Sequence, residues 1–306
     1  MGMTKISRRI MVILVLCCGF ILVGCGKQAT NEKKDHKISV VTSTNFYGQI
    51  AKSVLGDKGT VKPIIKGSGD PHDFEPSIGD ANQVSGADVV VENGIGYDNW
   101  MNKLLKNGND DITVVDVGKI MHKKDGDNEH LWYDPETAEK LVHELENVYS
   151  ARQPHNKKYF HENGTKYLQK YNKVKKQADT AKKNLKQNNL NKKVDVSEPV
   201  FDDALNYMGY QVNSPEFANA TEKEVDPSPK SIKKIKDDIT KHRIAFFVDN
   251  TQADSKMVKQ LVDLANQHDV PVVKVTETIP ADKNYLEWMD NAYSQVLKIQ
   301  QQEMNK

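Results

Sequence analysis

The sequence predicts an α/β protein with two lobes, each a mainly parallel sheet flanked by helices, joined by one long rigid linking helix. Three observations predict it. Apolar runs of strand length alternate with stretches of helical periodicity, which is typical of parallel sheets. These runs fall into two series along the chain. Between the two series lies one long segment whose apolar residues keep a helical spacing.

The first series indicates an N-terminal lobe over residues 37–154, and the second a C-terminal lobe over residues 191–306. Strands are expected in the N-terminal lobe at 38–41, 61–65, 88–91 and 112–117, with helices at 46–55 and 100–105. Strands are expected in the C-terminal lobe at 194–196, 244–248 and 272–275, with a helix at 257–265.

The linking helix is predicted over residues 155–190. Its apolar stripe consists of Phe160, Tyr167, Tyr171, Val174, Ala178, Ala181 and Leu185. Residues 155–193 hold twelve lysines against Glu162 and Asp179, a local net charge of +10. Such a helix can lie on an anionic membrane surface or pack along both lobes with a solvated lysine face. The small Ala178 and Ala181 favour close packing, and a packed helix of this length would restrict large hinge closure.

Composition excludes several classes of protein. The 306 residues include 43 Lys+Arg and 42 Asp+Glu, so the net charge of +1 argues against a nucleic-acid partner. Mean hydropathy is −0.66 and there is a single long apolar run, which excludes a multi-span membrane protein. The three cysteines are Cys17, Cys18 and Cys25, so the body of the chain has no disulfide and no thiolate metal site.

The N-terminus has the pattern of a secretory signal. Lys5, Arg8 and Arg9 precede an apolar run at 10–23, which ends in Leu22-Val23-Gly24-Cys25. This tetrapeptide resembles a bacterial lipobox, in which the cysteine is lipidated and becomes the first residue of the mature chain. Residues 1–24 are then the signal peptide and 25–36 a lipidated tether, and loss of three positive charges leaves a mature net charge of −2. The alternative is an uncleaved anchor with incidental cysteines.

Four segments contain candidate ligand residues. His72 lies between Pro71 and Pro76 on a stiff turn, and His130 lies in a second segment, which ends in Pro135. Glu198 and Glu277 each follow a predicted strand, where open α/β sheets bind ligands. The structural alternatives are a surface turn for His72 and a favourable helix N-terminus for Glu198.

These segments resemble the ZnuA/TroA/PsaA-like metal-binding lipoproteins of bacterial ABC importers. The resemblance rests on 70–76, 129–135, Ser197-Glu198, Glu277, and Glu92-Asn93-Gly94 with Trp100 behind it. It implies a metal held between the lobes by His72, His130, Glu198 and Glu277, with Asp249 or Asp254 as alternatives to Glu277. It also implies delivery to the transmembrane subunit of an ABC permease from the outer face of the cytoplasmic membrane, with Cys25 as the lipid anchor and no catalysis.

Two imidazoles and two carboxylates suit a borderline or hard dication rather than Cu⁺. Zn²⁺ and Mn²⁺ both remain open as the transported ion, because monodentate carboxylates suit Zn²⁺ and bidentate ones suit Mn²⁺. We expect a monomer with no organic cofactor. A secreted metallohydrolase would need an open coordination position and a general base, and no His-Glu-x-x-His pattern occurs. A surface adhesin is the third hypothesis.

Overall fold

The computed structural model describes residues 36–67, 69, 71, 72, 74–253 and 255–305. The predicted signal peptide, Cys25 and most of the tether lie outside the described residues, as does Asp254. Residues 37–306 form one unit that contains both sheets. None of the helices in the described part is both long and apolar enough to cross a bilayer.

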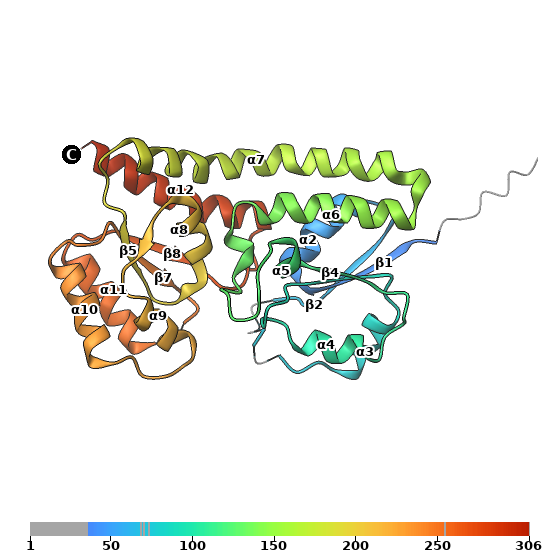
Figure 1. Ribbon diagram of the computed structural model, residues 1–306, viewed down its shortest axis with the longest axis horizontal. Coiled ribbons are helices and arrows are strands. Elements are labelled where there is room, and N and C mark those ends of the chain that lie inside the picture. Colours follow the sequence, from blue (N-terminus) through green and yellow to red (C-terminus); the bar gives the residue numbers. More distant parts are fainter. Residues whose placement is uncertain (1–35, 68, 70, 73, 254, 306) are drawn as a thin grey trace, which may run out of the picture. The chain divides into compact units, whose positions relative to one another are not determined.

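The N-terminal lobe contains a parallel sheet with strand order β2-β1-β3-β4 (Figure 1). Its strands are β1 (Ile38–Thr44), β2 (Gly59–Ile65), β3 (Val89–Glu92) and β4 (Thr113–Asp116). Its helices are α2 (Asn45–Leu55), α3 (Ile78–Ser85), α4 (Trp100–Leu105) and α5 (Val117–Ile120). Strand β1 extends beyond the predicted apolar run because Thr42, Ser43 and Thr44 are fully buried although polar. The first residue of β2, Gly59, has no room for a side chain, because a Cβ there would lie 2.1 Å from the Ile38 carbonyl oxygen.

The C-terminal lobe repeats the arrangement with strand order β6-β5-β7-β8, again parallel. Its strands are β5 (Lys193–Val196), β6 (Gln211–Val212), β7 (Phe247–Asn250) and β8 (Val272–Val275). Its helices are α8 (Asp202–Met208), α9 (Pro215–Glu222), α10 (Pro229–Thr240), α11 (Lys256–Gln267) and α12 (Tyr285–Met304), and the 3-10 turn η3 spans Pro199–Phe201. The predicted architecture is confirmed. β6 escapes prediction because it is two residues long and neither residue is buried.

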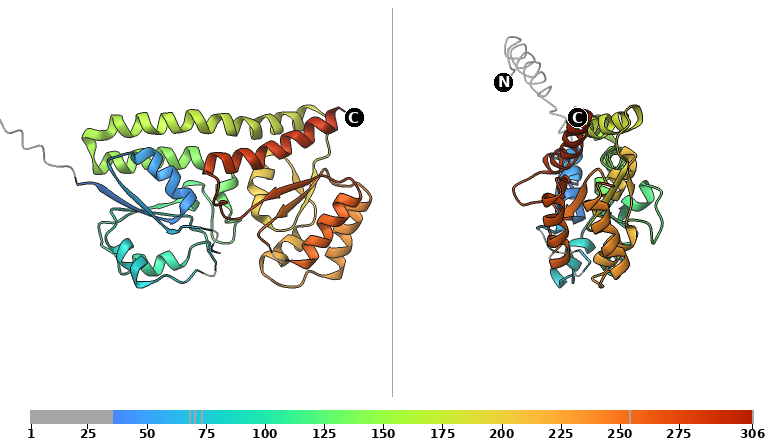
Figure 2. Two further views of the ribbon diagram at one scale, coloured as in Figure 1. Left: turned by 180° about the vertical axis from the view of Figure 1, so that it is seen from behind. Right: turned by 90° about the vertical axis from the view of Figure 1, so that its left-hand side faces the viewer.

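The linking helix is α7 (Lys157–Gln187), which follows α6 (Thr137–Arg152) and the 3-10 turn η2 (Pro154–Asn156). At 31 residues it is about 46 Å long. It lies against α6, α2, α8 and α12. Figure 2 shows α7 running along both lobes, with α6 beside it at the N-terminal lobe and α12 beside it at the C-terminal lobe. All seven residues of the predicted stripe are buried, which confirms a helix packed along both lobes.

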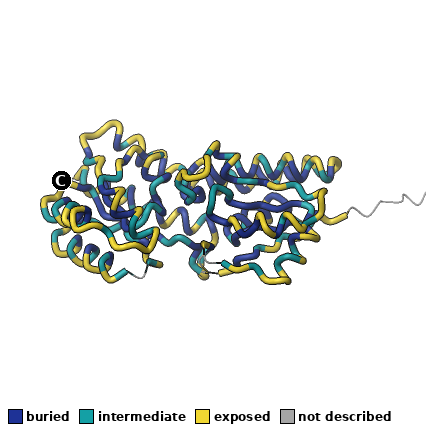
Figure 3. Tube along the Cα trace, turned by 60° about the horizontal axis from the view of Figure 1, so that its bottom comes forward, coloured by how far each residue is buried: buried dark blue, intermediate teal, exposed yellow. Residues whose placement is uncertain are grey.

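One apolar cluster joins the two lobes. It contains Val91 of the first sheet, Val196 of the second, Ala178 of α7 and Trp288 of α12. Buried residues occur in both lobes, as the tube coloured by burial shows (Figure 3). One face of each sheet therefore belongs to a shared hydrophobic core, and each lobe has a second apolar cluster of its own.

Three tyrosine hydroxyls fix the chain where the lobes meet. Tyr285 donates to the Trp132 carbonyl at 2.6 Å, Tyr293 to the Tyr133 carbonyl at 2.9 Å, and Tyr171 to the Pro135 carbonyl at 3.0 Å. The segment after His130, including the 3-10 turn η1 (Leu131–Tyr133), is thus held by α7 and α12.

Candidate metal centre

His72 lies in the loop that follows β2. The indole Nε1 of Trp100 donates to the Pro71 carbonyl at 3.1 Å, and the Trp100 ring packs on Phe74 at 4.8 Å between centroids. These contacts hold the loop on both sides of His72. The imidazole itself meets the ring of Tyr97 edge-on at 5.3 Å, and its side chain is 36% exposed.

His130 is almost completely buried, with 1% of its side chain exposed. Its Nδ1 lies 3.0 Å from Asn128 Oδ1, and its backbone N–H donates to the same oxygen at 2.8 Å. An amide oxygen only accepts, so this contact assigns the proton to Nδ1 and leaves the lone pair on Nε2. Burial lowers the pKa of His130 to about 3, and the nearby His72 adds to the shift, so the imidazole is neutral. Nε2 has no hydrogen-bond partner among the described residues.

Carboxylates from both lobes surround the two imidazoles. His72 Nε2 lies 3.7 Å from Glu129 Oε1 and 3.6 Å from Glu277 Oε1, and His130 Nε2 lies 3.4 Å from Glu222 Oε1. Ligands on one dication are about 3 Å apart when adjacent and about 4.4 Å apart when opposite, given metal–ligand bonds of 2.0–2.3 Å. The measured spacings fall in that range.

One group of three side chains among the described residues could hold a metal ion. His72, Glu129 and Glu222 each offer an atom, and these atoms lie within 4.8 Å of one another. Burial raises the pKa of Glu129, and Asp98 raises it further, while the charge of His72 opposes both effects. The site therefore gathers negative charge in a place where water screens it poorly.

Glu277 sits in a loop that is held on both sides. The Tyr133 hydroxyl donates to the Thr276 carbonyl at 2.8 Å, and Trp288 Nε1 donates to Thr276 Oγ1 at 2.9 Å. On the other side, Gln252 makes two hydrogen bonds of 2.8 Å with Thr278, one to its backbone N–H and one to its hydroxyl. The loop is thus rigid at the position of the carboxylate.

Glu198 follows β5, as predicted, and is held by its neighbours in the C-terminal lobe. Asn250 Nδ2 donates to Glu198 Oε2 at 2.5 Å, and the Asn250 backbone N–H donates to Ser197 Oγ at 2.9 Å. The next residue, Pro199, accepts a 2.7 Å hydrogen bond from Asn128 Nδ2 through its carbonyl. The residue after Glu198 therefore contacts the segment that contains His130, while the Glu198 carboxylate accepts a hydrogen bond from Asn250.

The structure brings His72 and Glu277 together and places His130 beside Glu222. The predicted set of His72, His130, Glu198 and Glu277 stays a prediction. Asp249, one alternative to Glu277, is half-buried, and its pKa is raised by burial. Sequence reasoning left the role of Glu129 open and missed Glu222, which lies at the C-terminal end of a helix and not at the end of a strand.

This arrangement of two sheets and a linking helix is also the fold of solved proteins described as periplasmic metal-binding proteins. A cadmium-bound periplasmic metal-binding protein from Candidatus Liberibacter asiaticus matches with a TM-score of 0.70 and 17% identity, covering 86% of this chain and 100% of that chain. The SBP FpvC from Pseudomonas aeruginosa, in complex with Ni²⁺, matches with a TM-score of 0.67 and 19% identity, covering 88% and 98%. At this identity the likeness shows the fold.

A match to a protein-family model shows the family of this chain. Residues 40–298 match the model of the family described as the periplasmic zinc-uptake complex component A, ZnuA, and the chain belongs to this family. The resemblance noted from the sequence is thereby confirmed.

Curated relatives are named as metal-binding lipoproteins. The manganese-binding lipoprotein MntA of Halalkalibacterium halodurans is 28% identical over 51% of this chain and 54% of its own length. The manganese ABC transporter lipoprotein PsaA of Streptococcus pneumoniae is 28% identical over 60% and 63%. The metal ABC transporter lipoprotein SloC of Streptococcus mutans is 26% identical over 82% and 84%. The matched region spans 54% and 63% of the length of the first two relatives.

Proposed function

We propose that this protein captures a divalent transition metal, Zn²⁺ or Mn²⁺, between its lobes and delivers it to an ABC permease. The observation that supports this best is His130. A neutral imidazole with its Nε2 lone pair buried, lacking a hydrogen-bond partner in the described part of the chain and 3.4 Å from a carboxylate of the other lobe, is suited to bind a cation. Without an ion, a buried polar atom of this kind costs stability.

The ligand set includes His72, His130 and Glu277, with Glu198 as the fourth predicted member. His130 is fixed by Asn128 and Glu277 by the held loop, so two ligands are preorganised. Neutral imidazoles and anionic carboxylates neutralise the charge of a dication without a counter-ion. The choice between Zn²⁺ and Mn²⁺ depends on how many ligands bind the ion and on whether the carboxylates bind through one oxygen or two.

The remaining parts of the proposal follow from membership of a solute-binding family. The protein is held outside the cytoplasmic membrane by lipid on Cys25, acts as a monomer, and meets the permease through its two lobes. The relatives named as lipoproteins of ABC transporters support this location and this partner. A solute-binding role requires no turnover, in contrast to the metallohydrolase alternative.

Competitive titration of metal-stripped, lipid-free mature chain (residues 26–306) with Mn²⁺ and Zn²⁺ tests the proposal. His72→Ala, His130→Ala, Glu198→Ala and Glu277→Ala should each weaken binding. His143→Ala is the matched control, because His143 is 55% exposed on α6. Binding that persists unchanged in His130→Ala would contradict the proposal.

A further inference from the structure

We propose that Glu222, the last residue of α9, is a metal ligand of the C-terminal lobe and that Glu129 joins it. The cargo ion would then be held by two imidazoles and by carboxylates from both lobes, in place of a four-residue shell. This proposal rests on the proposed function, because it specifies the shell around the same ion.

The geometry favours Glu222 over a surface role. Its side chain is 19% exposed, and its Oε1 is 3.4 Å from His130 Nε2, the buried atom that lacks a hydrogen-bond partner among the described residues. A neutral imidazole that points its lone pair at a carboxylate oxygen is repelled by it. A cation placed between the two atoms removes that repulsion and satisfies both.

Glu129 completes the argument from the N-terminal lobe. One atom each of His72, Glu129 and Glu222 lie within 4.8 Å of one another, so a single ion can reach all three. The Glu129 carbonyl accepts a hydrogen bond from Asn93 Nδ2 at 3.0 Å, which fixes the backbone of this ligand to the end of β3. Gly96 leaves room for the carboxylate, since a Cβ there would lie 3.3 Å from Glu129 Oε2.

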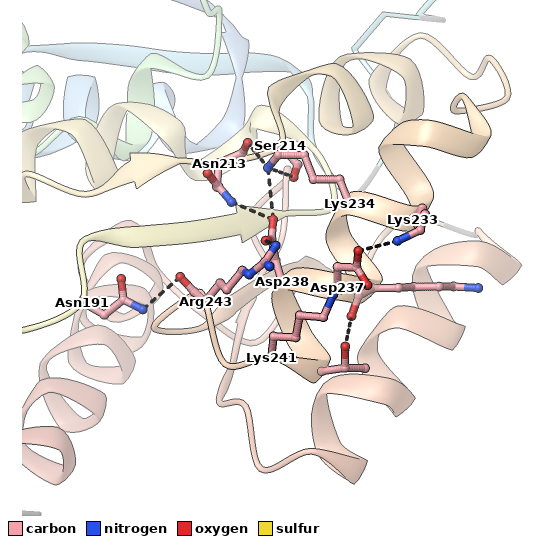
Figure 4. A network of polar contacts seen from close by, with 11 residues as sticks. Asn191, Asn213, Ser214, Lys233, Lys234, Asp237, Asp238, Lys241 and Arg243 are labelled. Carbon is pink, nitrogen blue, oxygen red and sulfur yellow. Dashed lines mark hydrogen bonds and ion pairs between the residues drawn. The ribbon is translucent and has the colours of Figure 1, made fainter.

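A polar network positions the helix that ends at Glu222. Figure 4 shows Lys234 of α10 directed at Asn213 and Ser214, which immediately precede α9. Lys234 donates to the Asn213 carbonyl and to Ser214 Oγ (2.8 Å), and Asn213 Nδ2 donates to Asp238 at 2.7 Å. Arg243 pairs with the same Asp238 at 3.7 Å.

The remaining length of α9 is fixed by packing. Phe217 and Ala218 are buried, so the helix cannot rotate without exposing them. Eight residues carry the chain about 12 Å from the anchored Ser214 to Glu222. The start of α9 and the direction of its buried face are therefore determined by the fold.

Additional carboxylates change which ion the shell prefers. Zn²⁺ is satisfied by four ligands in a tetrahedron, whereas Mn²⁺ takes more oxygen ligands. Loss of one carboxylate should therefore weaken Mn²⁺ binding more than Zn²⁺ binding. Glu222 and Glu129 would act as selectivity residues as well as ligands.

The test compares Glu222→Gln and Glu129→Gln with Glu224→Gln in the metal-stripped mature chain. Glutamine keeps the size of the side chain and removes the charge. We expect the Kd for Mn²⁺ to rise at least about tenfold in Glu222→Gln, with a smaller rise for Zn²⁺. Glu224 is exposed two positions further on, so Glu224→Gln should stay within about twofold of the parent.

His130→Ala in the same titration separates the two proposals. If His130→Ala loses binding while Glu222→Gln stays within about twofold of the parent for both ions, the inference on Glu222 fails and the proposed function stands. If neither variant changes binding, the proposed function fails with it. Thermal melting of each metal-free variant confirms that the chain is folded.

Discussion

Asn128 Oδ1 receives both the backbone N–H of His130, at 2.8 Å, and its imidazole Nδ1, at 3.0 Å. The same side chain donates through Nδ2 to the Pro199 carbonyl of the opposite lobe at 2.7 Å. One amide thus sets the tautomer of His130 and ties it to the segment that follows Glu198. A contact of this kind raises the basicity of a metal-binding imidazole and fixes its orientation.

Asn128→Leu removes these three hydrogen bonds while keeping a similar volume. We expect metal affinity to fall by about 10- to 100-fold, the usual effect of losing a partner behind a ligating histidine. Isothermal titration with Mn²⁺ and Zn²⁺ measures it. Asn102→Leu, at an exposed position on α4, is the control and should bind as the parent does. Unchanged affinity in Asn128→Leu would show that packing alone orients His130.

Acid should destabilise the metal-free protein through His130. Its pKa is about 3 when folded, below the ordinary 6.5, so between these values the unfolded chain takes up a proton that the folded chain does not. The contribution of His130 to stability is therefore complete above about pH 6.5 and declines by about 3 kcal/mol by pH 4. Denaturant unfolding in chelator at pH 7 and pH 4 measures it, with His130→Phe as the reference. Parallel losses in both proteins would contradict the assignment.

Gly164→Ala should destabilise the contact between α6 and α7. Alanine gains about 1 kcal/mol of helix propensity over glycine. Its Cβ would, however, lie 1.8 Å from Glu146 Oε1 and 3.0 Å from Val142 Cγ1, and overpacking typically costs about 1–3 kcal/mol. We expect a net loss of about 1 kcal/mol in chemical unfolding.

Two further variants serve as controls for Gly164→Ala. In a Glu146→Ala background the nearest obstacle is gone, so adding Gly164→Ala should cost less. Gly79→Ala in α3 meets only Ser77 Oγ at 3.4 Å and should be neutral or slightly stabilising. A stabilising Gly164→Ala in the parent would mean that Glu146 moves aside at no cost.

The fold could be predicted wherever burial and apolar character coincide. The seven-residue stripe of α7 follows from its helical spacing, and every described strand except β6 overlaps a predicted apolar run. β1 is longer than predicted because its last three residues are polar and still buried, and β6 is too short to leave a pattern. In both cases neighbouring elements, rather than local sequence, determine the structure.

The candidate site likewise contains residues that the sequence predicts and one that it does not. His72, His130 and Glu277 stand beside prolines or at strand ends, and these positions are visible in the sequence. Glu222 stands at the end of a helix, among exposed lysine and glutamate residues. Its place beside His130 depends on how α9 is anchored by Lys234, a tertiary contact that no local pattern encodes.

The apolar cluster shared by both sheets, α7 and α12 makes the two lobes one thermodynamic unit. Separating them would expose the buried faces of α7 and α12 and break the tyrosine contacts to the segment after His130. Heating should therefore give a single cooperative transition, and neither half of the chain should remain folded when expressed alone. Evolution of this chain by exchange of one lobe is correspondingly constrained, because a new lobe would have to fit the apolar cluster that both lobes share.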